Sequence, residues 1–186
     1  MSVPRHAVLT GAPGAGKTTL LDAAAAAGIQ TSPEVARQLL QGPGGMELRE
    51  VDPLGFAEAM LEAHRREYER WADYSGPVLF DRGFPDVVGF LEVSGLPVSP
   101  EIDRTCRDLR YHGPILRAPA WADIYVQDAE RIQDWQGAVA SDEAVTAAWR
   151  RYGYEVSELP FAPVAKRLDF MRNLLDTPDG HKRGLE

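Results

Sequence analysis

The sequence predicts an α/β domain in which a mainly parallel β-sheet is covered by helices on both faces. Three observations lead to this prediction. Short apolar runs alternate along the chain with longer segments of helical character. A glycine-rich stretch joins the first apolar run to the first helical segment. The length of 186 residues is typical of one domain. Strands that alternate with helices are typical of parallel sheets with both faces buried.

The N-terminal quarter of the chain is expected to form two strands and the helix between them. Residues 7–10 (AVLT) are the first strand, and the helix that follows the glycine loop ends at Gly28. Residues 29–31 are a short second strand. Ser32, Pro33 and Glu34 then begin a helix, because Ser is a good cap and Pro is favoured at the first helical position.

The middle of the chain contains the clearest strand of the sequence. The sequence QGPGG at 41–45 is a flexible break, and Asp52 with Pro53 opens a longer helix that reaches about residue 74. Residues 77–81 (PVLFD) form an apolar run that ends on a carboxylate. We expect this run to be a buried strand.

The second half continues the alternation and ends in a tail. The predicted elements are helices at 85–94 and 100–111, a strand at 115–117, a polar segment at 121–136, a helix from Ser141 to about 152, a strand within 153–160 and a helix at 162–175. We therefore expect one domain over residues 1–176. The polar segment at about 121–136 is its lid, and residues 177–186 are a flexible C-terminal tail.

Composition narrows the class of protein. A hydrophobic content of 44% excludes wholesale disorder, and a net charge of −8 argues against a protein that covers a nucleic-acid backbone. Cys106 is the only cysteine, so the chain can form neither an intramolecular disulfide nor a multi-cysteine metal site. No apolar run approaches the roughly 18 residues of a membrane helix. These features predict a cytoplasmic protein without a membrane partner.

The glycine loop matches the phosphate-binding pattern GxxxxGK[ST] in full. In such a loop, glycines allow successive backbone N–H groups to face phosphate oxygens at a helix N-terminus. Lys17 is expected to contact the β- and γ-phosphates, and the Thr18 hydroxyl to bind Mg²⁺. The predicted nucleotide-binding residues are Gly11, Ala12, Pro13, Gly14, Ala15, Gly16, Lys17, Thr18 and Thr19.

Asp81 is the candidate second acid of this site, because it ends a buried strand beside the loop. It is followed by Arg82 and Gly83, so the second acid that orients water in AAA+ ATPases is missing. The NKxD pattern of regulatory GTPases is absent as well: Asn173, the only asparagine, is followed by Leu174. The residues alone leave two roles open for Asp81, metal ligand or the base that accepts a proton from the acceptor hydroxyl.

The sequence resembles a family of small kinase-like P-loop proteins, "predicted ATPases" often labelled AAA-type, whose relatives include nicotinamide riboside kinase and nucleotide kinases. The resemblance covers nearly the whole chain and rests on TGAPGAGKTTL at 10–20, SPEVAR at 32–37, LFDRGFPD at 79–86, IYVQDAERIQDW at 124–135 and GYEVSELPFAPVAKRLDF at 153–170. It implies a P-loop NTPase fold, a three-layer α/β/α sandwich whose five-stranded parallel sheet has the order 2-3-1-4-5. It also implies that Asp81 and Arg82 form a DR pair and that Arg131 is a catalytic lid arginine.

The leading functional hypothesis is an ATP- and Mg²⁺-dependent phosphotransferase that acts on a small molecule, with nucleoside-like compounds as candidates. Glu34, Arg37 and Arg82 are the candidate acceptor-binding residues, and a simple ion pair is the alternative for Glu34 with Arg37 or with Arg82. Lys17, Asp81 and Arg131 are the candidate catalytic residues. An NTPase that transfers the phosphoryl group to water, or a nucleotide-dependent switch, remain alternatives. The expected assembly is a monomer or a homodimer.

Overall fold

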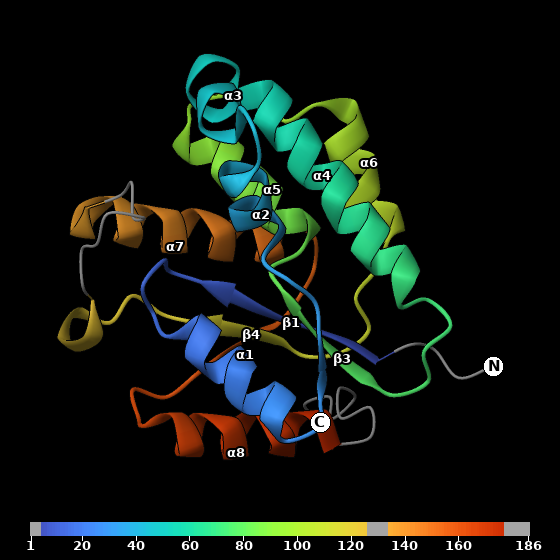
Figure 1. Cartoon of the computed structure of the whole chain (residues 1–186), viewed down its shortest axis with the longest axis vertical. Helices are drawn as coiled ribbons and strands as arrows, with labels where there is room; N and C mark the ends of the chain where they lie inside the picture. Colours follow the sequence, from blue (N-terminus) through green and yellow to red (C-terminus); the bar gives the residue numbers. More distant parts are fainter. Residues whose placement is uncertain (1–4, 126–133, 177–186) are drawn as a thin grey trace, which may run out of the picture.

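The computed structural model describes residues 5–125 and 134–176 and contains a five-stranded parallel sheet (Figure 1). The strands are β1 (Arg5–Gly11), β2 (Gln30–Thr31), β3 (Pro77–Asp81), β4 (Ile115–Ala118) and β5 (Val156–Glu158). Their order in the sheet is β2-β3-β1-β4-β5. The register places Leu9 beside Asp81, and Gly11 beside Ala118. The predicted fold class and strand order are therefore confirmed.

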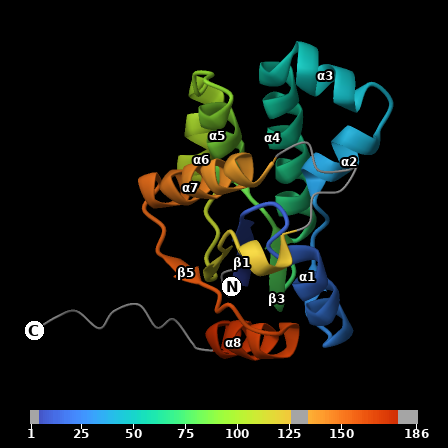
Figure 2. The same ribbon diagram turned by 90° about the vertical axis from the view of Figure 1, so that its left-hand side faces the viewer.

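Helices cover both faces of this sheet (Figures 1 and 2). On one face lie α1 (Lys17–Ala26) and α8 (Val164–Asp176). The other face carries α2 (Val35–Gln41), α3 (Gly45–Val51), α4 (Pro53–Arg70), α5 (Phe84–Val93), α6 (Pro100–Asp108) and α7 (Trp135–Arg151). A 3₁₀ turn, η1 (Ala122–Ile124), follows β4.

β1, β3 and β4 each contribute to two separate cores because successive side chains of a strand point to opposite faces. Val8 and Phe80 belong to the core under α4 to α7, which also contains Trp149. Leu9 and Leu79 belong to the core under α1 and α8. All five side chains are fully buried. The apolar runs of β1 and β3 are thus continuous because both of their faces are covered.

The helix after β2 begins later than the sequence predicts. Its first residue is Val35, and Glu34 occupies the N-cap position. The prediction that Ser32 is the cap is wrong, because Ser32 still belongs to the strand region. Its N–H donates to the Leu79 carbonyl at 3.0 Å, and its hydroxyl accepts from the Asp81 N–H at 3.2 Å. Sheet pairing therefore displaces the local capping signal.

The start of α7 and the presence of α3 also differ from expectation. α7 begins at Trp135 rather than Ser141, because the Asp134 carboxylate caps it by accepting the Gly137 N–H at 2.8 Å. α3 is an extra short helix in the interval that the sequence left unassigned between 45 and 52. The predicted start of α4 is confirmed: Asp52 caps it and Pro53 is its first residue.

Three expectations concern residues outside the described ranges: Arg131, the centre of the predicted lid at 126–133, and the tail at 177–186. Among the residues described, none of the helices is both long enough and apolar enough to span a membrane.

Candidate active site at the carboxyl edge of the sheet

The phosphate loop follows β1 directly and its glycines are needed for its shape. At Gly11 the backbone φ is 115°, and a Cβ there would lie 2.2 Å from the Ala118 carbonyl oxygen. The next residue, Ala12, donates its N–H to that same oxygen at 3.0 Å. Gly14 and Gly16 also have positive φ, 74° and 76°. The loop thus leaves the sheet in a conformation that side chains would block.

Lys17 folds back onto the loop that it ends. Its Nζ donates to the Ala12 carbonyl at 2.5 Å and to the Gly11 carbonyl at 3.4 Å. Burial, and next the nearby Arg82 guanidinium, lowers the pKa of Lys17. No carboxylate of the described residues forms an ion pair with this ammonium group. The lowering of the pKa is offset in part by the carboxylates of Asp81, Glu34 and Asp86. A buried cation whose hydrogen bonds go to carbonyls is suited to an anionic ligand.

Arg167 of α8 supports the loop from the other side. It is 4% exposed, and its Nη1 donates to the Ala15 carbonyl at 2.8 Å. Its Nε is buried without a hydrogen-bond partner. The guanidinium also lies 5.9 Å from the centre of the Trp121 ring. The C-terminal helix is therefore tied to the loop by a single long side chain.

Asp81 and Thr18 supply oxygen atoms at the same edge of the sheet. Asp81 is 5% exposed, and its Oδ1 is buried without a hydrogen-bond partner. Burial, and next the Glu34 carboxylate, raises the pKa of Asp81. Thr18 lines the pocket described below. A carboxylate oxygen that lacks a donor and a hydroxyl are hard ligands, so this pair fits the requirements of Mg²⁺.

Asp86 is the most heavily hydrogen-bonded carboxylate of the site. Its Oδ1 accepts from the Thr10 hydroxyl at 2.6 Å and from Arg82 Nη1 at 3.0 Å. Its Oδ2 accepts from the Gly83 N–H and from Trp149 Nε1, both at 3.0 Å. Four donors use the hydrogen-bonding capacity of the Asp86 carboxylate, so its role is to hold its neighbours in place.

Arg82 is held between several carboxylates. Its backbone φ of 68° is the one positive value among the described non-glycine residues. Burial alone would lower its pKa, but Asp86, Glu34 and Asp81 outweigh that effect and raise the pKa. Glu34 lies at 3.9 Å, whereas Asp86 lies at 3.0 Å. The expected pairing with Glu34 is therefore the weaker of the two. The positive φ of Arg82 is a strained backbone conformation, and such strain is common at functional sites.

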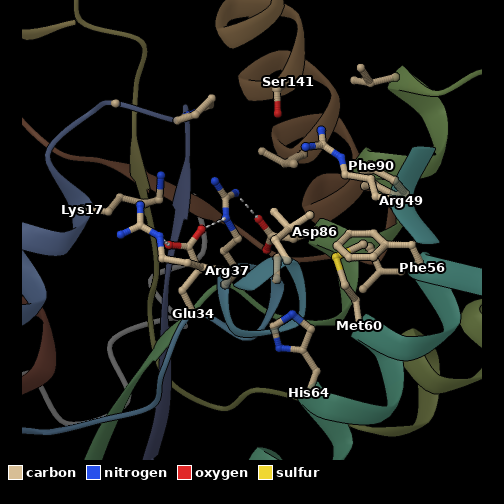
Figure 3. Close-up of a pocket in the computed structure, with 18 of the residues that line it drawn as sticks. Lys17, Glu34, Arg37, Arg49, Phe56, Met60, His64, Asp86, Phe90 and Ser141 are labelled. Atoms are coloured by element: carbon tan, nitrogen blue, oxygen red, sulfur yellow. Dashed lines mark hydrogen bonds and ion pairs between the residues drawn. The ribbon is translucent and has the colours of Figure 1, made fainter. Parts of the chain in front are cut away.

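Glu34 and Arg37 lie together at the start of α2. Arg37 Nε is 3.4 Å from Glu34 Oε2, and the Arg37 side chain is about half exposed. Both residues line the pocket. One pocket lining thus brings together Lys17, Glu34, Arg37 and Arg82. Figure 3 shows the first three of these residues.

One continuous pocket of about 530 Å³ begins at the phosphate loop and extends into a chamber between α2, α3, α4, α5 and α7. This size is in the usual range for small-ligand sites. At the loop end the lining is polar. Farther in it is apolar and aromatic, with Phe56, Met60, His64 and Phe90 grouped on one side (Figure 3). Burial lowers the pKa of His64 to about 4, so this imidazole is neutral.

Arg117 of β4 takes part in a separate arrangement. It donates to both carboxylate oxygens of Asp142, at 2.9 and 2.7 Å, and to Glu158 at 2.8 Å. Asp142 also accepts the Ala120 N–H. Arg117 therefore ties α7 to β4 and β5.

Sequence reasoning missed the inner chamber, Arg49, Asp86 and Arg167. A local signal exists for Asp86, which stands three residues after Gly83, the position from which an acidic side chain bonds the N-cap N–H. No local signal exists for the chamber, because its walls come from helices far apart in the sequence.

A family profile described as an AAA domain matches residues 6–167. No curated protein sequence matches the chain. Among solved structures, a deoxyadenosine kinase from M. mycoides with products dCMP and dCDP has 13% identity and a TM-score of 0.67. The alignment covers 90% of this chain and 97% of that one.

A second similar structure is the NadR protein in complex with NR. It has 17% identity and a TM-score of 0.68, over 95% of this chain and 51% of that one. NadR was also solved with NAD and AMP-PNP, at 16% identity and a TM-score of 0.67. At these identities the likeness shows a shared P-loop kinase-like fold.

Proposed function

The chain belongs to the AAA-domain family that its residues 6–167 match, and we propose that it is an ATP- and Mg²⁺-dependent phosphotransferase for a small hydroxylated molecule. The pocket is the observation that carries this proposal. A single cavity joins the phosphate loop to a chamber with an apolar and aromatic lining. A phosphotransferase needs donor and acceptor side by side, whereas a hydrolase needs only water next to the γ-phosphate.

The loop and Lys17 would hold the triphosphate through backbone N–H groups and one ammonium group. Thr18 and Asp81 would hold Mg²⁺, because their oxygens suit a hard cation and Asp81 Oδ1 has no other partner. Bound Mg²⁺ would neutralise charge on the phosphates. Arg131, outside the described residues, would add positive charge from the lid when it closes.

Glu34 is the pocket carboxylate best placed to accept the acceptor proton. It lines the cavity together with Lys17, whereas Asp81 is not among the lining residues and Asp86 already accepts from four donors. The acceptor oxygen attacks the γ-phosphorus, and the bond from the γ-phosphorus to the bridging oxygen breaks. ADP leaves with that electron pair, and the hydroxyl proton passes to Glu34. Arg37 and Arg82 keep the Glu34 carboxylate in position.

The residues after Asp81 favour transfer to an acceptor over hydrolysis. Arg82 and Gly83 stand where a water-orienting acid would be needed. The relatives of known structure add support, since one is a deoxyadenosine kinase and another binds NR. Nucleosides are accordingly the first acceptors to test.

The test measures ADP release from ATP and Mg²⁺ with a panel of nucleosides, nucleotides and phosphorylated metabolites, while inorganic phosphate is followed separately. We expect ADP release to accelerate with the right acceptor and phosphate release to stay slow. Glu34→Gln should lower the acceptor-dependent kcat by about 100-fold and leave the ATP Kd within a few-fold. Exposed Glu62→Gln is the control. Fast phosphate release without acceptor would show an NTPase, and tight ATP binding without turnover would show a switch.

A further inference from the structure

The pocket lining carries more positive than negative charge, although the chain as a whole has a net charge of −8. Its cations are Lys17, Arg37, Arg49 and Arg82, and its carboxylates are Glu34 and Asp86. His64 adds no charge, since burial holds its pKa at about 4. A positive cavity in an acidic protein concentrates anions locally.

Most of these cations have a partner or an assigned role. Arg37 pairs with Glu34, and Arg82 pairs with Asp86 and Glu34. Lys17 belongs to the phosphate loop. Arg49 is the remaining cation of the lining, and it forms no ion pair with any residue that the structure describes.

Arg49 comes from α3 and lines the part of the pocket that also contains Phe90. Its guanidinium is 5.9 Å from the centre of the Phe90 ring. Figure 3 shows it projecting into the cavity beside Phe90, on the opposite side from Lys17. The residue is half-buried. A cation on an apolar wall is only partly compensated by an aromatic ring, and an oxyanion would compensate it better.

We propose that Arg49 binds an anionic group of the acceptor, a carboxylate or phosphate at the end remote from the hydroxyl that receives the phosphoryl group. This inference rests on the proposed phosphotransferase activity. On the same side of the cavity as Arg49, Phe56, Met60 and Phe90 offer a surface for a planar, apolar ring (Figure 3). The acceptor class is therefore an aromatic or heterocyclic ring that carries a hydroxyl on one side and an oxyanion on the other.

The experiment compares acceptors that differ only in that charge. Orotidine and uridine, and nicotinic acid riboside and nicotinamide riboside, are matched pairs for a carboxylate. 4-(Hydroxymethyl)phenyl phosphate and 4-(hydroxymethyl)phenol are the pair for a phosphate, because the charge lies across the ring from the hydroxymethyl group. Wild-type protein should use the anionic member of one pair with a kcat/KM about 10-fold or more above that of the neutral member.

Arg49→Met keeps an unbranched apolar stem and removes the charged guanidinium, so it should abolish this preference while the KM for ATP changes less than about two-fold. Arg49→Lys should retain part of the preference, and it replaces Arg49→Met if that variant does not fold. Arg66→Met, on the exposed face of α4, should leave the preference intact. Equal use of both members of every pair, or a preference that survives in Arg49→Met, would overturn the inference and leave the phosphotransferase proposal standing.

A binding measurement separates the two proposals further. Calorimetry in the presence of ADP and Mg²⁺ gives the Kd of each compound without turnover. If no acceptor accelerates ADP release, the proposed activity fails. Tighter binding of one anionic member that disappears in Arg49→Met would still support the role of Arg49. Binding of neither anionic member, or equal binding within each pair, would refute it.

Discussion

At the scale of single residues, the site places two carboxylates close to the end of β3 and gives them different environments. Asp86 accepts hydrogen bonds from four donors, whereas Asp81 has one buried oxygen without a partner. Both are almost fully buried. A saturated carboxylate holds structure together, and an unsaturated one is available to a ligand. The difference in hydrogen bonding therefore separates the roles of Asp81 and Asp86.

Replacement of Lys17 by Met should remove nucleotide binding and preserve the fold. The ammonium group is buried and contacts only carbonyls, so its loss relieves a desolvation cost. We expect the ATP Kd to rise by about 100-fold or more, since charge-assisted contacts to phosphate are lost. Calorimetry and a thermal melt check both parts. Unchanged ATP affinity, or a large fall in Tm, would contradict this assignment.

Asp86→Asn should destabilise the protein strongly. The change removes the closest charge partner of Arg82, whose side chain is 15% exposed. It also places an amide N–H₂ opposite existing donors. Breaking one side of a buried ion pair costs about 3 kcal/mol of unfolding free energy. Urea unfolding measures this loss, with exposed Asp22→Asn as the control. A difference below about 1 kcal/mol would mean that Asp86 is not the anchor of this cluster.

At the scale of elements, the sequence predicted features formed by neighbouring residues and missed features formed by segments that lie far apart in the chain. The phosphate loop could be identified because its pattern, the strand before it and the helix after it are contiguous. The strand ending at Asp81 could be identified for the same reason. The Ser32 cap failed because pairing between Ser32 and Leu79 is a contact between distant segments. Arg49 could not be found, because nothing near it in sequence indicates that α3 faces the pocket.

The hydrogen bond from Arg167 of α8 to the phosphate loop should influence nucleotide binding. Arg167 fixes the Ala15 carbonyl, and this contact leaves the loop N–H groups free to face the opposite side. We expect Arg167→Met to raise the ATP Kd by about 10-fold, since one hydrogen bond from a charged donor is lost. Arg167→Lys should recover part of the affinity. Arg172→Met, exposed on the same helix, is the control. Equal ATP affinity in Arg167→Met and wild type would limit Arg167 to a packing role.

The contact between α5 and α7 depends on the absence of a side chain at residue 89. A Cβ on Gly89 would lie 2.7 Å from the Val145 Cα and 2.8 Å from its backbone nitrogen. Backbone atoms cannot move aside as a flexible side chain would, so the two helices would have to separate. Gly89→Ala should therefore lower the unfolding free energy by about 2 kcal/mol despite the better helix propensity of alanine. Chemical denaturation checks the sign, and an increase in stability would refute close packing here.

At the scale of the whole molecule, two cores on either side of one sheet explain why the fold class was predictable. Continuous apolar runs such as 77–81 require cover on both faces, and alternating helices supply it. The same layering buries polar side chains that no pattern identified. His6 is 1% exposed and His64 is 3% exposed. Their burial against aromatic neighbours links the pH dependence of the whole fold to individual residues.

Protonation of the buried histidines should weaken the folded state in mild acid. Burial lowers the pKa of His64 from 6.5 to about 4, and burial also lowers the pKa of His6. Because the unfolded chain binds protons more readily at these positions, the stability that these two imidazoles contribute is complete above pH 6.5 and falls as the pH drops toward 4. The raised pKa of Asp81 acts in the opposite direction.

His64 alone should contribute a loss of about 3 kcal/mol over this interval. Urea unfolding at a series of pH values measures the slope of the free energy of unfolding against pH. The series runs from about 7.5, one unit above the ordinary histidine pKa, down to about 4. His64→Gln should flatten the slope whatever its effect at neutral pH, and exposed His112→Gln should leave it unchanged. The comparison of slopes isolates the histidine contribution from the carboxylates that both variants retain. If wild type and His64→Gln lose the same free energy between neutral pH and the acid limit, the imidazole of His64 does not couple protonation to folding.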